Sequence, residues 1–327
     1  MSMAASILIT GGTSGLGYHA AQSFAKEFPS HRIILASRTN PHNAAETINQ
    51  HLHQENIEYR PLDLSSLSSV RAFVREWTEN KYPPIQYLLL NAGLQTSAPV
   101  QYTEDGFEKT FAVNHLGHAL LLSLLIPSLD NNARIILTTS ANHDPETIFQ
   151  GSEAARYTSI EEMARPEPDT KYEGVTYPGR LRYANSKLVS LLWMYALERR
   201  LKALREAKKR NWTVAAYSPG MATGTGIVRE EGAVLVFMFV YLMPLLVPLL
   251  RVLMGRTDIW TVEVAGEMFA RVAVDGTEDA SGKYYEGDKV RKSSQASYDE
   301  GKQEEVWRWT VDTLAEGEER KVFSLDI

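Results

Sequence analysis

Residues 6–17 read S-I-L-I-T-G-G-T-S-G-L-G, and the fold is decided by this stretch. The apolar run at 6–10 is typical of a short buried strand, and 11–17 is a turn that opens a helix through about Phe28. Gly11, Gly15 and Gly17 permit turn conformations that are closed to other residues, and they let backbone N–H groups approach a pyrophosphate. Their spacing is G-x-x-x-G-x-G, whereas most dinucleotide-binding folds carry G-x-G-x-x-G. The stretch therefore predicts a strand–turn–helix unit that binds a nucleotide.

Strands and helices alternate along most of the chain. Asn40-Pro41 predicts a helix N-terminus, with proline at the first helical position, in a helix that runs to about Glu55. Strands that alternate with helices predict an α/β fold, a doubly wound parallel sheet covered by helices on both faces. Further strands are expected at 31–37, 57–62, 85–90, 134–138, 212–217 and 282–286, and further helices at 66–80, 104–129, 159–164, 181–200, 258–274 and 302–316.

The composition is that of an ordinary globular protein. The chain has 327 residues, of which 44% are hydrophobic and 23% charged, and its net charge is −6. A nucleic-acid partner is not expected, because it would call for a basic surface. The absence of cysteine excludes disulfides and thiol catalysis, and the eight histidines predict no metal site. Only six residues precede the first apolar run, too few for a secretory signal, so we expect a cytoplasmic protein.

Tyr183 and Lys187 lie four residues apart on a predicted amphipathic helix, so they project from the same face. The unperturbed pKa of a tyrosine phenol is about 10, so the phenol gives up its proton poorly at neutral pH. A nearby ammonium group stabilises the phenolate and lowers that pKa. The pair is therefore a candidate general acid/base, with Lys187 expected to lower the pKa of Tyr183. The plain alternative is an aromatic and a lysine that merely share a helix surface.

The end of the second strand indicates which cofactor is bound. An acidic residue there would bind the ribose 2′-hydroxyl of NAD, whereas an arginine accommodates a 2′-phosphate. The chain has Ser37-Arg38-Thr39 at this point and no acidic residue. Arg38 therefore favours NADP(H) over NAD(H), unless it is simply a solvated arginine.

Seven short motifs follow one another along the chain: T-G-G-T-S-G-L-G at 10–17, D-L-S at 63–65, N-A-G at 91–93, V-N-H-L-G-H at 113–118, T-T-S at 138–140, Y-A-N-S-K at 183–187 and S-P-G at 218–220. In this order and at this spacing they resemble the short-chain dehydrogenase/reductase family, and the resemblance covers most of residues 6–290. Within that family, the chain is most similar to the branch of the retinol dehydrogenases and the WW-domain oxidoreductases, because of V-N-H-L-G-H, R-I-I-L-T-T-S at 134–140 and S-G-K-Y-Y at 281–285.

The resemblance implies a Rossmann sheet of about seven strands and hydride transfer between a nicotinamide and a carbonyl or alcohol. It makes Tyr183 the proton donor or acceptor, and Lys187 the residue that binds the nicotinamide ribose. Ser140 would hydrogen-bond the substrate oxygen, and Asn114 would kink its helix to hold a water in the proton relay. The developing alkoxide needs donors, which Ser140 and Tyr183 can supply. His143, just past Ser140, could also line the pocket.

The same resemblance assigns the cofactor site. Asp63 would contact adenine, Asn91 would support the central strand and the cofactor, and Pro219-Gly220 would flank the nicotinamide. Thr223 and Thr225 bracket the place of a threonine that usually meets the cofactor amide, and Thr223 is our choice. The expected cofactor-binding set is Gly11, Thr13, Ser14, Gly15, Leu16, Gly17, Arg38, Asp63, Leu64, Asn91, Ala92, Gly93, Tyr183, Lys187, Pro219, Gly220 and Thr223.

We expect one catalytic domain, residues 1–290, followed by a C-terminal extension, 291–327. Residues 142–179 are an insertion beside the substrate mouth, a lid or an inert decoration. The family places an apolar flap over its substrate, here 221–257. It often dimerises through the helix that carries the catalytic tyrosine, so a homodimer is an open possibility.

Residues 232–250 read G-A-V-L-V-F-M-F-V-Y-L-M-P-L-L-V-P-L-L and are long enough to suggest a membrane span. Pro244 and Pro248 would break a lone spanning helix. The leading interpretation is a flap whose apolar part, 232–254, touches a membrane surface, and the second is an apolar lid or an oligomer contact. Both imply a bulky apolar substrate, such as a steroid, terpenoid, polyketide or retinoid.

The sequence thus predicts an NADPH-dependent ketoreductase or alcohol dehydrogenase. A first alternative is a family member that reduces a C=C bond or isomerises through transient oxidation, for which the same tyrosine and lysine would serve. A second is a nucleotide-sensing interaction protein without turnover. Its expected mark is a damaged catalytic set, whereas Asn114, Ser140, Tyr183 and Lys187 are all present.

Overall fold

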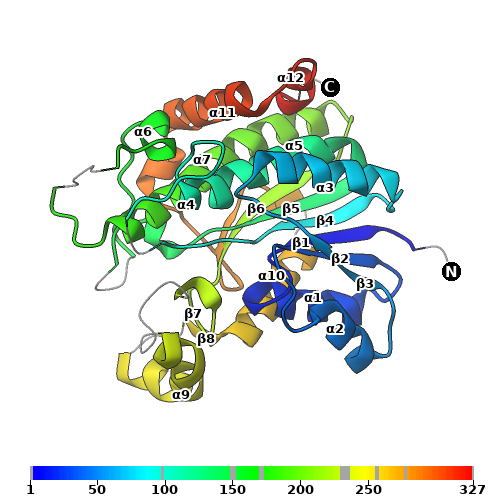
Figure 1. The fold of residues 1–327 in the computed structure, drawn as a ribbon, viewed down its shortest axis with the longest axis horizontal. Helices are drawn as coiled ribbons and strands as arrows, with labels where there is room; N and C mark the ends of the chain where they lie inside the picture. Colours follow the sequence, from blue (N-terminus) through cyan, green and yellow to red (C-terminus); the bar gives the residue numbers. More distant parts are fainter. Residues whose placement is uncertain are drawn as a thin grey trace.

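A central β-sheet forms the middle layer of the molecule (Figure 1). The computed structural model describes residues 3–96, 99–147, 152–168, 173–228, 236–254, 258–275 and 278–325. The strand order is β10-β9-β6-β5-β4-β1-β2-β3, and every pairing is parallel except that of β10 with β9. This arrangement confirms the doubly wound Rossmann fold. The strands are β1 (Ser6–Thr10), β2 (Arg32–Ser37), β3 (Ile57–Pro61), β4 (Ile85–Leu90), β5 (Leu129–Thr138), β6 (Thr213–Ser218), β9 (Tyr284–Glu286) and β10 (Lys289–Arg291).

The sheet has one strand more than the seven expected. The additional strand, β10, pairs with β9 in an antiparallel hairpin, with Lys289 opposite Glu286. Gly287 in the turn has a φ of +60°, a conformation that glycine adopts without strain. A second, two-stranded sheet pairs β7 (Met221–Thr223) with β8 (Ile259–Thr261).

Helices cover both faces of the sheet, as the sequence predicts. One face carries α1 (Gly15–Glu27), α2 (Ala44–Leu52) and α10 (Val262–Asp275), and the other carries α3 (Leu67–Glu79), α5 (Gly117–Leu125) and α7 (Pro178–Glu206) (Figure 1). Ile7 and Ile9 of β1 pack with the α1 layer, whereas Leu8 packs with the opposite layer. A strand buried on both faces reads as the continuous apolar run seen in the sequence.

The helix expected at 104–129 is shorter and irregular. It begins with α4 (Lys109–Phe111), widens into a π-helical turn, η1 (Ala112–Leu116), and continues as α5. The Glu108 side chain accepts a hydrogen bond from the Phe111 N–H and so caps α4. This cap explains why the helix does not start at 104. Asn114 lies in the π-helical turn, a feature that is frequent at functional sites.

The expected N-terminus of the second helix is wrong by several residues. The helix α2 begins at Ala44, preceded by Asn43 in a left-handed conformation. Asn40 still serves this helix, because its side-chain oxygen accepts a hydrogen bond from the Ala44 N–H at 2.7 Å. Pro41 precedes the helix instead of occupying its first position.

The C-terminal residues form a third layer over α7 and α5 (Figure 1). It consists of η7 (Gln295–Tyr298), α11 (Glu300–Leu314) and α12 (Glu319–Phe323). Trp307 of α11 stacks on Trp193 of α7 with ring centroids 6.1 Å apart. The helix that carries Tyr183 is therefore covered by its own chain on the side where α11 lies, and a dimer contact there would compete with this layer.

The described part of the apolar run forms one helical segment, the π-helical turn η5 (Met238–Leu242) followed by α9 (Met243–Met254). Residues 229–235 and 255–257 lie outside the described part of the chain. Met238–Leu253 is shorter than the roughly 20 residues that a spanning helix needs. Lys109–Ser128 is long and apolar enough, but 83% of its most apolar window is buried inside the fold.

In the described parts of the insertion, 142–147, 152–168 and 173–177, the one α-helix is α6 (Ile160–Ala164), close to the helix expected there. Its loops are fixed by polar contacts. The Glu153 carboxylate accepts hydrogen bonds from the Thr176 and Tyr177 N–H groups. The Arg156 N–H donates to the Asn185 side chain on α7 at 2.7 Å.

The close contact of α10 with α1 can be tested by a substitution at Gly266. A Cβ at this position would lie 2.5 Å from the Cβ of His19 and 2.9 Å from the Leu16 carbonyl. We expect Gly266→Ala to lower the free energy of unfolding by about 1–3 kcal/mol through overpacking, measured by urea denaturation. Gly226→Ala is the control, because its added methyl meets open space. Equal midpoints for the two variants would contradict the proposed close packing.

Candidate active site

A large cavity opens at the carboxyl ends of the parallel strands, beside the point where the strand order reverses between β1 and β4. Its volume is about 520 Å³. Ligands of open α/β sheets bind at such a switch point. The cavity brings together these residues of the expected site: Gly11, Thr13, Ser14, Gly15, Leu16, Arg38, Asp63, Leu64, Asn91, Ala92, Gly93, Ser140, Tyr183, Lys187, Pro219 and Gly220.

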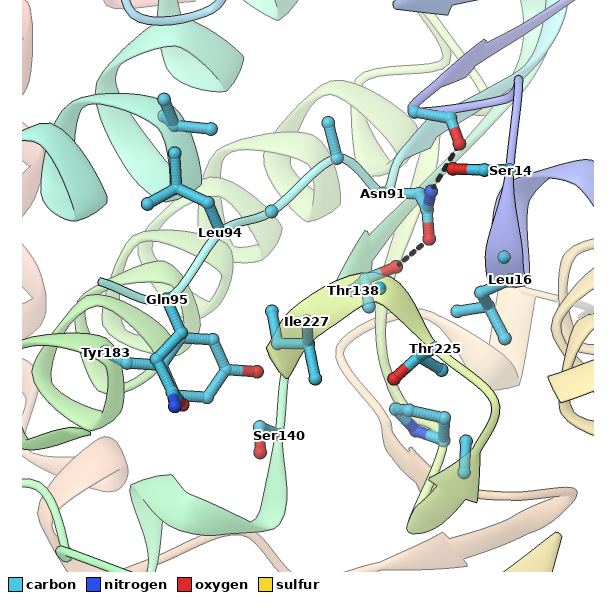
Figure 2. A pocket seen from close by; sticks show the side chains of 18 of the residues that line it. Ser14, Leu16, Asn91, Leu94, Gln95, Thr138, Ser140, Tyr183, Thr225 and Ile227 are labelled. Carbon is cyan, nitrogen blue, oxygen red and sulfur yellow. Dashed lines mark hydrogen bonds between the residues drawn. The ribbon is translucent and has the colours of Figure 1, made fainter. Parts of the chain in front are cut away.

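Three residues of the expected set do not line this cavity. Gly17 lies in α1, where a Cβ would approach the Gly11 carbonyl oxygen to 2.5 Å, so it allows the turn and the helix to pack closely. Asn114 is buried behind Leu94 and Ser186. Thr223 is fully buried and donates to the Trp260 carbonyl at 3.1 Å, whereas Thr225 lines the cavity (Figure 2). Of the two threonines, the structure therefore favours Thr225 as the one that can meet a ligand.

The glycine turn presents the N-terminus of α1 to the cavity. Gly11 and Gly15 have φ values of +67° and +57°, and a Cβ on Gly15 would meet nothing within 4 Å. The Ser14 side chain makes no capping hydrogen bond to the helix. The first N–H groups of a helix favour anions, so this open turn fits a pyrophosphate.

Asn91 ties the ends of neighbouring strands together beside the turn (Figure 2). Its side-chain NH₂ donates to the Thr10 carbonyl of β1 at 2.8 Å, and its side-chain oxygen accepts from the Thr138 hydroxyl of β5 at 3.3 Å. The Asp63 carboxylate accepts from the Ser65 N–H and hydroxyl, which fixes the turn after β3 at the cavity wall.

Tyr183 and Lys187 project from α7 toward Ser140, which follows β5. The Tyr183 ring and the Ser140 side chain lie at the same end of the cavity (Figure 2), and Ser140 is near enough to lower the pKa of the phenol. The Lys187 ammonium lies 5.6 Å from the centre of the Tyr183 ring and donates to the Thr138 carbonyl at 2.9 Å. A buried phenol, a hydroxyl and a cation thus meet at one wall of the cavity. Such a group can donate a proton to a carbonyl oxygen and stabilise charge on it.

The pKa of Tyr183 corrects an expectation from the sequence. Burial raises the pKa of Tyr183 to about 12, and only the neighbouring Ser140 side chain opposes this. Burial also lowers the pKa of Lys187 to about 8, so the same loss of hydration that disfavours the phenolate weakens the cation beside it. The expected lowering of the Tyr183 pKa by Lys187 is not seen in the structure. At neutral pH the phenol is protonated, the form that can act as an acid.

Asn114 braces two helices and a loop. Its side-chain oxygen accepts from the Leu94 N–H at 2.9 Å, and its NH₂ donates to the Ser186 hydroxyl at 2.9 Å. Its backbone carbonyl accepts from the Ser190 hydroxyl at 3.3 Å. The role of holding a water in a proton relay stays a prediction from the resemblance.

His143 is not at the cavity surface. Its Nδ1–H donates to the Ser140 carbonyl at 2.7 Å, and its Nε2 accepts from the Ser294 N–H at 3.0 Å. Both partners require the neutral ring, and burial accordingly lowers the pKa of His143. His115 and His118 are buried, each with a pKa lowered to about 3 by desolvation. Among the described residues, no cluster of metal-ligating side chains is found.

Some lining residues were not predicted. Ile227 and Phe239, from the segment expected to form the flap, give the cavity an apolar wall. Gln95, Ser152 and Arg180 also line it. Phe239 belongs to a run whose apolar character the sequence showed, whereas Ser152 and Arg180 carry no local signal.

Comparisons with known proteins identify the family of the chain. The short chain dehydrogenase family profile matches residues 5–152. The chain belongs to the short-chain dehydrogenase family of NAD(P)-dependent oxidoreductases. The short-chain dehydrogenase TIC 32 B of Brassica napus is 34% identical over 229 residues, which span 69% of this chain and 66% of that protein. The polyprenol dehydrogenase of Homo sapiens is 27% identical over 307 residues, 92% of this chain and 82% of that protein.

The expected branch is confirmed by a WW domain-containing oxidoreductase of Gallus gallus. It is 35% identical over 199 residues, 60% of this chain and 45% of that protein. Among solved structures, an uncharacterized protein from Mycobacterium paratuberculosis superposes with a TM-score of 0.65 and 24% identity, covering 95% of this chain and 93% of that one. That likeness concerns the fold alone.

Tyr183→Phe tests the proposed acid. We expect turnover of a hydrophobic alcohol such as farnesol, followed by nicotinamide absorbance, to fall about 10²- to 10⁴-fold. Cofactor affinity, measured by fluorescence titration, should stay the same, because the ring remains. The control is Tyr195→Phe on the same helix, where the hydroxyl contacts Ser293 instead of the cavity. Turnover that survives Tyr183→Phe would disprove the assignment.

Proposed function

We propose that the protein is an NADP(H)-dependent oxidoreductase that interconverts an alcohol and a carbonyl group on a bulky apolar substrate. The observation that carries this proposal is the convergence of Ser140, Tyr183 and Lys187 on the cavity that also holds the glycine turn. The alternatives of a C=C reductase or an isomerase use the same residues, and product analysis distinguishes them. A nucleotide sensor without turnover is disfavoured because the catalytic residues are intact.

The residues present fit a nicotinamide dinucleotide. The Gly11–Gly15 turn and the N-terminus of α1 would hold the pyrophosphate, and the wall at Asp63-Leu64 would meet the adenine. Lys187 would bind the nicotinamide ribose. When bound, the nicotinamide supplies or accepts the hydride.

The chain's own chemistry is the transfer of a proton. In the reductive direction Tyr183 donates its phenolic proton to the substrate oxygen, while Ser140 donates a hydrogen bond to the same oxygen. Burial keeps the phenol protonated until that charge develops, since the pKa of Tyr183 is about 12. Lys187, fixed on the Thr138 carbonyl, then stabilises the phenolate that is left.

Arg38 supports the preference for NADP(H). It is exposed at the cavity mouth after β2, and in the described part of the chain it forms no ion pair with a carboxylate. The neighbouring Thr13 hydroxyl donates to the Thr39 carbonyl at 3.0 Å, which fixes the loop. A guanidinium in this position suits a 2′-phosphate.

We expect Arg38→Asp to weaken NADPH binding about 10- to 100-fold and NADH binding far less, because only NADPH carries the 2′-phosphate. Binding is measured by fluorescence titration with each cofactor. Arg75→Asp makes the same change of charge at an exposed site outside the cavity, and both affinities should survive it. Equal losses for NADPH and NADH would contradict the assignment.

The apolar segment supports a lipid-like substrate that is met at a membrane surface. Phe239 faces the cavity, whereas residues spaced three or four apart on the same helical run are exposed. Leu245 and Val252 are 77% and 78% exposed. The human relative is named for a polyprenol, a long isoprenoid alcohol. The exposed stripe is Met238, Tyr241, Leu242, Leu245, Leu249, Val252 and Leu253.

The test uses isoprenoid alcohols of increasing length, geraniol, farnesol and geranylgeraniol, with and without phosphatidylcholine vesicles. The double variant Leu245→Ser/Val252→Ser should lose co-sedimentation with vesicles and raise KM for geranylgeraniol in vesicles, while kcat for soluble geraniol stays unchanged. Val264→Ser/Val290→Ser is the matched control, because it removes exposed apolar side chains elsewhere. A wild-type protein that does not sediment would refute membrane docking, and the geraniol assay would still test the oxidoreductase.

A further inference from the structure

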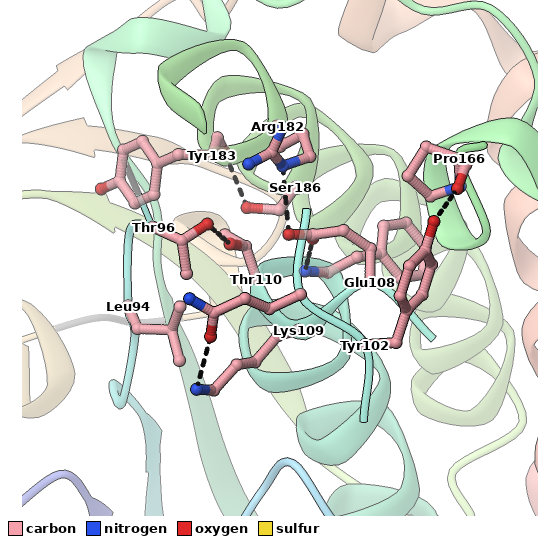
Figure 3. A network of polar contacts seen from close by, with 12 residues as sticks. Leu94, Thr96, Tyr102, Glu108, Lys109, Thr110, Pro166, Arg182, Tyr183 and Ser186 are labelled. Atoms are coloured by element: carbon pink, nitrogen blue, oxygen red, sulfur yellow. Dashed lines mark hydrogen bonds and ion pairs between the residues drawn. The ribbon is translucent and has the colours of Figure 1, made fainter. Parts of the chain in front are cut away.

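A buried ion pair lies behind the active site, between the helix of Asn114 and the helix of Tyr183 (Figure 3). Arg182 Nε donates to Glu108 Oε1 at 3.3 Å. The two residues are 6% and 0% exposed, so this is the most deeply buried ion pair between described residues. Neither of them lines the cavity.

Each member of the pair is attached to a catalytic element. Arg182 directly precedes Tyr183 in α7, and Glu108 lies six residues before Asn114. The second carboxylate oxygen of Glu108 accepts from the Phe111 N–H at 2.7 Å and so caps α4. The Glu108 N–H donates to the Ala164 carbonyl at 2.8 Å, which ties the same point to α6 of the insertion.

A second set of hydrogen bonds joins the helix of Asn114 to the helix of Tyr183. The Asn114 NH₂ donates to the Ser186 hydroxyl at 2.9 Å, and that hydroxyl donates to the Tyr183 carbonyl at 2.7 Å. Tyr183 is therefore held from both sides, through Arg182 before it and Ser186 after it.

Stability alone does not explain a charged pair at this place. Taking two charges out of water is unfavourable, and replacing such a pair with apolar side chains of similar volume is often neutral or stabilising. The pair is also imperfect, because Arg182 Nη2 is buried without a hydrogen-bond partner. Directional contacts of this kind fix the relative placement of two helices more narrowly than apolar packing does.

We propose that Glu108 and Arg182 form a positioning pair that sets the first turns of α7 against α4 and η1, and thereby places the Tyr183 hydroxyl beside Ser140 in the cavity. The pair touches neither substrate nor cofactor and acts only through Tyr183 and Asn114. This inference rests on the acid role proposed above for Tyr183.

The decisive variant is Glu108→Gln/Arg182→Met. Glutamine keeps an acceptor for the Phe111 N–H, and methionine fills the space without leaving a lone buried charge. We expect this variant to fold with an unchanged thermal midpoint and unchanged affinity for NADPH. Its kcat should fall about 10- to 100-fold, as expected for a misplaced acid, and the apparent pKa in its pH–rate profile should shift. The single variant Arg182→Lys keeps the positive charge, so its kcat should lie between that of the double variant and that of the wild-type protein.

Arg205→Met is the matched control. It breaks the ion pair between Arg205 and Glu198, which is also largely buried. Both residues lie on α7, but far along the helix from Tyr183. This control should leave kcat and the pH–rate profile unchanged. Wild-type kcat and pH profile in the double variant would overturn the proposal, because the pair would then be structural only.

A crystal structure of the double variant supplies a readout that does not depend on turnover. We expect the distance between the Tyr183 hydroxyl and the Ser140 hydroxyl to increase. If this distance is unchanged, the positioning role is refuted even when the alcohol used is not a substrate. If the distance increases and the wild-type protein does not turn over any alcohol, the positioning role stands and the proposed reaction fails.

Discussion

The fold and the site depend on one constraint, that the parallel strands end at the same edge and must be joined there. Asn91 meets it by bonding to the Thr10 carbonyl of β1 and to the Thr138 hydroxyl of β5. Lys187 extends the connection to α7, because its ammonium donates to the Thr138 carbonyl. The glycine turn begins directly after Thr10. The polar groups that terminate the sheet therefore also fix the distance between the phosphate end of the cavity and the phenol of Tyr183.

The same groups are buried, and burial decides their ionisation. A phenolate and a neighbouring ammonium are expected to stabilise each other's charge. Burial instead favours the neutral form of both groups, because it raises the pKa of Tyr183 to about 12 and lowers that of Lys187 to about 8. Loss of hydration outweighs the attraction between the two charged forms. A protonated Tyr183 at neutral pH suits reduction of a carbonyl more directly than oxidation of an alcohol.

Most residues of the expected site line the cavity, because each local pattern lies within a few residues. Gly11 to Gly17 and Tyr183 to Lys187 need only one turn or one helix face, so the sequence alone defines them. The choice between Thr223 and Thr225 depends on β7 pairing with β8, a contact between residues about forty positions apart, and Thr223, the choice made from the sequence, does not line this cavity. The start of α2 was predicted too early, because Asn40 caps the helix from four residues before its first residue. The start of α4 was also predicted too early, because Glu108 caps that helix. The pKa of Tyr183 could not be read from the sequence, because it follows from burial.

The C-terminal layer shows why a residue outside the motifs can control the chemistry. The Ser294 N–H holds His143 in one neutral tautomer, and that ring in turn donates to the Ser140 carbonyl. Thr310 of α11 contacts His115, the neighbour of Asn114, while Trp307 stacks on Trp193 of α7. His143 contacts Ser140 directly, and His115 is next to Asn114 in the chain, so two of these contacts lead to a candidate catalytic residue. A helix buried between the sheet and this layer cannot shift by itself, so the extension, the insertion and the buried pair behind Tyr183 together determine where the phenol lies.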